Sequence, residues 1–171
     1  MELRNYPPHK IILILLILIV ILSACAPVVT QTPAPREVVG DVADAAAAQS
    51  AAETFLQAWG SEEYGDMYAA LSSLSRDAID FTEFESVYRD AANNLTLESL
   101  AFQLLSAMAE NDHAAVAYKV NYKTRLVGEL TREVVMNLTR ENNTWRVQWE
   151  PGLILPELRN GNRLELVHET P

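Results

Sequence analysis

The chain has 171 residues and a formal net charge of −10, from 13 basic and 23 acidic residues. Removing residues 1–24 leaves 11 basic and 22 acidic residues, so the remainder is strongly acidic. This balance excludes a nucleic-acid binder, which needs a basic stripe, and it disfavours adsorption to anionic lipid. About 130 residues remain after the N-terminal segments, which predicts one domain with a single core.

The N-terminus has the pattern of a bacterial lipoprotein signal. Arg4 and Lys10 precede an unbroken apolar run, Ile11–Leu22, and the sequence Leu22-Ser-Ala-Cys25 follows. A membrane-spanning helix needs about 20 apolar residues, so this shorter run suits a secretory signal better. We therefore predict a signal peptide over residues 1–24 and lipid attachment at Cys25. The alternative is an uncleaved helix over residues 11–29, and both readings place the rest outside the cytoplasmic membrane.

Cysteine and proline usage extends this interpretation. Cys25 is the only cysteine, so the chain can form no internal disulfide and no cysteine-based metal site. Residues 25–40 contain three prolines and show no hydrophobic period, which predicts an extended tether. The folded domain is predicted over residues 41–158. Residues 159–171 are interpreted as an extension towards a missing downstream domain.

The first half of the domain has helical periodicity. Asp41 is a predicted N-cap and Gly60 a predicted helix end. The apolar stripe of this first helix consists of Val42, Ala45, Ala52, Phe55, Leu56 and Trp59. A short second helix is predicted over residues 64–71. Thr82-Glu-Phe-Glu85 fits a capping box for a third helix, whose apolar stripe is Phe84, Val87, Tyr88, Ala91 and Leu95.

The second half alternates with period two, which predicts strands. Three antiparallel strands are expected before the last one, with turns at residues 111–112, Gly128 and residues 141–143. Their inward residues are predicted to be Leu100, Phe102, Leu104 and Met108, then Val116, Tyr118, Val120, Tyr122 and Leu126, then Val134, Met136 and Leu138. Helices followed by an antiparallel meander indicate an α+β fold.

The last strand, Thr144–Glu150, is the most informative segment. Trp145, Val147 and Trp149 point to one face, and Pro151 ends the strand because it lacks an N–H for the ladder. We predict that Trp145 and Trp149 join the core against the first helix, beside Trp59. The apolar Leu153–Leu155 and a second proline, Pro156, follow.

This Trp-x-Val-x-Trp strand with its proline-bracketed apolar stretch resembles the end of the non-catalytic N-terminal domain of low-affinity class B penicillin-binding proteins. The resemblance covers roughly residues 41–166. It implies an NTF2-like cone, in which about three N-terminal helices pack on a curved four-stranded antiparallel sheet. It also implies a spacer role in cell-wall synthesis and an association with beta-lactam resistance.

Motifs for catalysis are scarce. A transpeptidase of this family needs Ser-x-x-Lys, and no serine here is followed by lysine three residues later. The three histidines, His9, His113 and His168, stand singly, so no metal or cofactor is expected. Tyr118 and Tyr122 are possible lining residues of the cone, although inward tyrosines are more often core residues. We expect no enzyme activity.

The sequence therefore predicts a lipid-anchored, non-catalytic spacer and interaction domain on the extracytoplasmic face of the bacterial membrane. Its expected partners are the membrane, through Cys25, and a transpeptidase domain or other cell-wall synthesis proteins. The alternative is a stand-alone lipoprotein that binds a small ligand or peptide in its cone.

Overall fold

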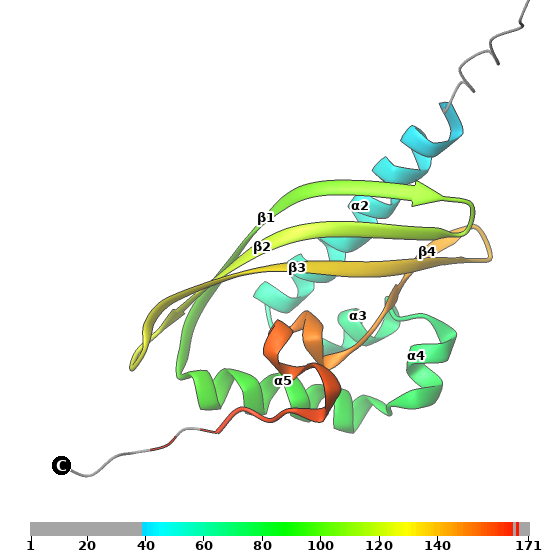
Figure 1. The fold of residues 1–171 in the computed structure, drawn as a ribbon. Coiled ribbons are helices and arrows are strands. Elements are labelled where there is room, and N and C mark those ends of the chain that lie inside the picture. The colour runs from blue at the N-terminus through cyan, green and yellow to red at the C-terminus, as the bar shows by residue number, and fades with distance from the viewer. Residues whose placement is uncertain (1–38, 166, 168–171) are drawn as a thin grey trace, which may run out of the picture. The chain divides into compact units, whose positions relative to one another are not determined.

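The computed structural model describes residues 39–165 and 167, so the predicted signal peptide, Cys25 and most of the predicted tether lie outside the described residues. In this described part of the chain, four helices are followed by four strands and two short 3-10 segments (Figure 1). The helices are α2 (Val39–Gly60), α3 (Tyr64–Ala69), α4 (Ser73–Ala78) and α5 (Phe81–Leu95). The later elements are β1 (Leu97–Glu110), β2 (His113–Thr124), β3 (Gly128–Glu141), β4 (Thr144–Gln148), η2 (Pro151–Leu153) and η3 (Pro156–Gly161).

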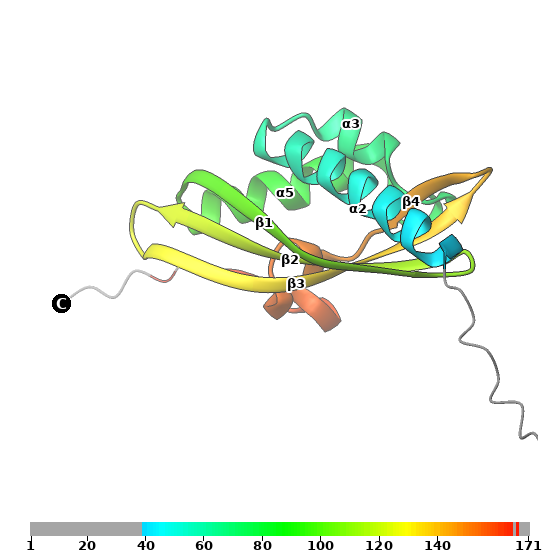
Figure 2. The same ribbon diagram turned by 90° about the horizontal axis from the view of Figure 1, so that it is seen from above.

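The strands form one antiparallel sheet in the order β1-β2-β3-β4, which confirms the predicted α+β class and meander. Figure 2 shows the curved sheet with the helices α2, α3 and α5 gathered on one side of it. The core lies between these layers, where alternate residues of β2 and β3 meet the apolar sides of the helices.

Helix α2 packs mainly against β1. It ends at Gly60, as predicted, but it starts at Val39, so Asp41 lies inside the helix and is not its cap. Val42 is 70% exposed and does not belong to the buried stripe, because it precedes the stretch that packs on the sheet. The buried residues of α2 are Ala48, Ala52, Phe55, Leu56, Ala58 and Trp59.

The layer of α3, α4 and α5 contains one helix more than the sequence predicted. Helix α4 has only six residues, too few for a visible hydrophobic period. The predicted capping box of α5 is also wrong. Asp80, not Thr82, is the N-cap, and its carboxylate accepts a hydrogen bond from the Glu83 backbone N–H at 2.9 Å.

The sheet departs from simple alternation in β1. The pairing of β1 with β2 shifts between Leu104 and Ser106, which is a β-bulge. One extra residue turns every later side chain to the other face, so Met108 is 71% exposed instead of buried. Leu126 is also exposed, because it lies in the β2–β3 turn rather than in the strand. The remaining predicted inward residues of β2 and β3 are buried.

The free side of β4 is covered by the segment that connects α3 to α4. The Val147 N–H donates to the Ala70 carbonyl at 3.0 Å, and the Ser72 N–H donates to the Val147 carbonyl at 2.8 Å. Strand β4 ends at Gln148, shortly before the predicted stop at Pro151, and Pro151 and Pro156 are the first residues of η2 and η3. The 3-10 segments carry Leu153, Ile154 and Leu155 into the core.

Candidate functional site

The inner face of the sheet is filled by side chains and by the chain's own C-terminal segment. Tyr118 and Tyr122 are both buried on β2. The Tyr118 hydroxyl donates to the Leu153 carbonyl at 2.8 Å, and the Tyr122 hydroxyl donates to the Ile154 carbonyl. Burial raises the pKa of both phenols, so both stay neutral donors. The structure therefore places these two residues in the core, with their polar atoms satisfied.

The three tryptophans have different surroundings. Trp59 is buried, and its ring packs edge-on against Tyr88 and Tyr122, with centroids 5.5 and 6.2 Å apart. Trp145 is buried beneath the Arg140 guanidinium, whose carbon lies 4.7 Å from the ring centroid. Trp149 is only partly buried, contrary to its expected place in the core. Its ring contacts Phe84 edge-on and donates a hydrogen bond to Tyr88, both in α5.

Ion pairs fasten the C-terminal segment over the inner face. Arg132 of β3 pairs with Glu157 of η3, and Arg159 pairs with Glu150 at 2.9 Å. Arg159 also crosses Gly152 so closely that a Cβ at this glycine would lie 2.5 Å from the Arg159 Cγ. Each of these pairs is partly exposed and weak by itself. Together with the tyrosine hydrogen bonds, they hold the segment from Glu150 to Arg159 as a plug in the sheet's concavity.

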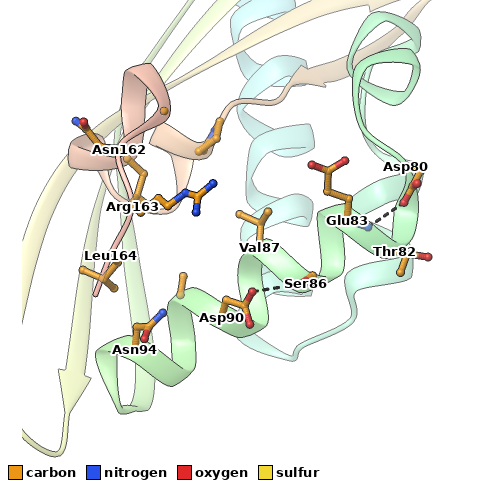
Figure 3. A pocket seen from close by; sticks show the side chains of 14 residues that line it. Asp80, Thr82, Glu83, Ser86, Val87, Asp90, Asn94, Asn162, Arg163 and Leu164 are labelled. Atoms are coloured by element: carbon orange, nitrogen blue, oxygen red, sulfur yellow. Dashed lines mark hydrogen bonds between the residues drawn. The ribbon is translucent and has the colours of Figure 1, made fainter. Parts of the chain in front are cut away.

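An open groove lies outside the core, between α5 and the chain that follows η3 (Figure 3). Its volume is about 880 Å³, within the range of about 300–1,000 Å³ that is typical of ligand sites. Side chains of α5 form one wall, and residues 161–164 form the other. Its apolar lining comes from Val87, Ala91, Pro151, Leu158 and Leu164.

Three carboxylates border this groove, and the sequence interpretation did not single them out. Asp80, Glu83 and Asp90 all line it, and Arg163 is the one basic residue among the described residues that do so. Spacings of three and seven residues place the three acids on one side of α5. This spacing is the only local sequence feature that could have indicated them. The opposite wall is about 70 residues away in sequence, so no local pattern could reveal the groove.

Other site types have little support in the described part of the chain. Within residues 39–165, no three His, Cys, Asp or Glu side chains gather in a group that could hold a metal ion. None of the described helices combines the length and the apolar character that a membrane crossing requires. Cys25, the predicted lipid attachment site, lies outside the described residues.

Comparison with solved structures finds remote similarities. Among curated proteins, none matches this sequence. Similar solved structures include an NTF2-like protein of unknown function from Pseudomonas putida, which is 12% identical, with 62% of this chain and 82% of that chain covered and a TM-score of 0.49. Another is an NTF2-like family protein from Streptomyces avermitilis whose name proposes a dehydratase, at 13% identity, 63% and 93% coverage and a TM-score of 0.47.

The family assignment comes from the sequence of the described domain. Residues 47–162 match the family described as NTF2-like N-terminal transpeptidase domain. The match includes most of α2, all of α3 to α5, the whole sheet and both 3-10 segments. It confirms the resemblance drawn from the Trp-x-Val-x-Trp strand. Because the matched residues make up more than half of the chain, the chain belongs to the family of NTF2-like N-terminal transpeptidase domains.

Proposed function

We propose that this chain is a non-catalytic, extracytoplasmic spacer and interaction domain of a penicillin-binding-protein-like lipoprotein. In this role it serves peptidoglycan synthesis and the response to beta-lactams. The observation that carries the proposal is the family match over residues 47–162. A domain that precedes a transpeptidase positions the catalytic domain and offers surfaces to partners, and it needs no reactive group of its own.

The packing of the inner face supports a non-catalytic role. The phenols that face inward, those of Tyr118 and Tyr122, are buried and bonded to backbone carbonyls of the plug. A general acid or base has to reach a bound substrate, and these hydroxyls are already engaged with the protein itself. This arrangement also favours the spacer role over a ligand held inside the cone.

The N-terminal sequence supports placement at the membrane. The apolar run Ile11–Leu22 ends in small residues before the single Cys25, the pattern of a processed and lipidated cysteine. Lipid at Cys25, followed by the proline-containing segment, would hold the domain a short distance outside the membrane.

A replacement experiment in the bacterium that encodes the chain tests this proposal. The parent gene, a Cys25→Ala variant and a deletion are compared for the protein's membrane fraction, peptidoglycan cross-linking and beta-lactam sensitivity. We expect Cys25→Ala to release the protein from the membrane, and both changes to alter beta-lactam sensitivity. The exposed Met108→Ala variant is the matched control and should behave as the parent does. Unchanged cross-linking and sensitivity in the deletion strain would contradict the proposed role.

A further inference from the structure

The acidic charge of the domain is concentrated in its helical layer. Residues 61–95, which include α3, α4 and α5, contain eight acidic and two basic residues. Residues 96–149, which form the sheet, contain six of each. Several sheet charges are neutralised in pairs, such as Lys119 with Glu133 and Lys123 with Glu98. The helical layer therefore attracts cations over a distance of about 8–10 Å at physiological salt, whereas the sheet has little net field.

The groove beside α5 lies in this acidic layer, and both acidic and apolar side chains line it. Asp80 and Glu83 lie at the N-terminal end of α5, and Asp90 lies two turns further on. Val87 of α5 and Leu164 of the opposite wall supply apolar surface. Figure 3 shows the Glu83 and Asp90 side chains on the α5 side of the groove. Long cationic side chains suit such a surface, because their methylene stems cover apolar groups while their charged ends reach carboxylates.

The length of the groove fits an extended peptide. From Asp80 to Asn94, α5 rises about 21 Å at 1.5 Å per residue. About six residues of extended chain span the same distance. The Thr82 hydroxyl and the Asn94 amide along the groove can exchange hydrogen bonds with a peptide backbone.

We propose that this groove binds an extended, cationic segment of a partner protein. The segment would place lysine or arginine side chains against Glu83 and Asp90 and aliphatic side chains on Val87 and Leu164. This inference deepens the interaction role proposed above. Peptide binding is measured in vitro, independently of the cellular experiment that tests the proposed function. A negative binding result would therefore contradict only the peptide site, and a negative cellular result would contradict only the proposed role in the cell.

Arg163 allows the direction of one change in peptide affinity to be predicted. Its side chain extends from the C-terminal wall towards α5 (Figure 3), and it is a cation already present in the groove. A lysine or arginine bound in the groove would be repelled by this charge. Removing the charge of Arg163 should therefore strengthen binding of a cationic peptide.

The test uses the full chain in neutral detergent and a fluorescein-labelled peptide of alternating lysine and valine, about six residues long. Fluorescence anisotropy gives the Kd at low and physiological salt. We expect Glu83→Gln with Asp90→Asn to raise the Kd about tenfold, and Arg163→Gln to lower it about threefold. Both acid replacements preserve the fold, because the Asp80 cap uses only the backbone N–H of Glu83 and asparagine at 90 can still accept from the Ser86 hydroxyl.

Controls separate groove binding from general attraction to an acidic protein. The double variant Glu110→Gln, Glu129→Gln removes the same charge from exposed strand ends and should leave the Kd within about twofold. The same peptide with glutamate in place of lysine should not bind, and spermine should compete only weakly because it lacks the apolar and backbone contacts. Equal weakening by both double variants, weaker binding by Arg163→Gln, or full competition by spermine would overturn the proposal.

Discussion

The indole of Trp149 connects the end of β4 to α5. Its ring lies edge-on to Phe84, with centroids 5.5 Å apart, and its Nε1 donates to the Tyr88 hydroxyl at 3.2 Å. Tyr88 is buried and also contacts the Trp59 ring. The partly exposed indole thus adds an aromatic contact and a hydrogen bond to a buried aromatic cluster.

Trp149→Phe should cost about 1 kcal/mol of folding free energy, because a ring is kept and one hydrogen bond is lost. Trp149→Ala should cost about 3 kcal/mol, the low end of the range for large aromatic residues, since the indole is only partly buried. The exposed Thr144→Ala is the control and should change stability by less than about 0.5 kcal/mol. Urea unfolding followed by circular dichroism measures all three. A parent-like midpoint for Trp149→Ala would show that β4 does not depend on this contact.

Tyr118 couples stability to alkaline pH. Burial raises its pKa, so the folded state keeps the proton that an unfolded tyrosine loses near pH 10. This contribution is full below about pH 10 and is lost as pH rises towards the folded pKa. Tyr118→Phe should cost about 1 kcal/mol at pH 7, because the hydrogen bond to the Leu153 carbonyl is lost. The difference between parent and variant should then narrow above pH 10 in urea unfolding. A constant difference from pH 7 to 11 would contradict this linkage.

At the scale of elements, Arg140 of β3 connects three parts of the fold. Its guanidinium donates to both carboxylate oxygens of Asp44 in α2, at 2.9 and 2.7 Å, and to the Asn111 carbonyl at 2.6 Å in the β1–β2 turn. It also lies over the Trp145 ring. A bidentate pair of this kind fixes orientation as well as distance. The N-terminal part of α2 is thereby fastened to the end of the sheet.

Asp44→Asn should loosen that end of α2 without unfolding the domain. Asparagine has one acceptor oxygen and no charge, so the paired contact to Arg140 is lost. Amide hydrogen exchange should become faster in residues 45–50, whereas exchange in β2 should stay at the parent rate. Glu53→Gln, an exposed change on the same helix, is the matched control. Equal protection of α2 in Asp44→Asn and the parent would show that packing alone holds this end.

Periodicity predicted the elements well where burial alternates without interruption. In β2, Val116, Tyr118, Val120 and Tyr122 alternate and are all buried, so strand and face were both correct. In β1 the bulge after Leu104 inserts one residue, and no local feature distinguishes the inserted residue from its neighbours. A similar limit applies to the α5 cap, where Asp80 and Thr82 are both chemically suitable.

At the scale of the whole molecule, the candidate groove could not be predicted from local patterns. Its walls are α5 and residues 161–164, which the intervening sheet separates in sequence and the fold brings together. Sequence composition did give the net acidity, but not the concentration of net negative charge in the helical layer, which appears only when the charges of helices and sheet are counted separately. The sequence favoured core positions for the inward tyrosines, but it did not predict the plug, which returns under β2 after Pro151.

The last prediction concerns the plug, which is either part of a solid core or a lid over a ligand-binding cavity. Ile154 is buried, and its carbonyl accepts the Tyr122 hydroxyl. If the interior is core, Ile154→Ala should cost about 2–5 kcal/mol, because a cavity forms where the chain cannot relax. Arg159→Gln, a change in the same segment at a partly exposed ion pair, should cost less than about 1 kcal/mol. Urea unfolding and the fluorescence of an apolar dye measure both. Parent-like stability of Ile154→Ala together with saturable dye binding would show instead that the plug acts as a lid, and would favour a ligand-binding lipoprotein.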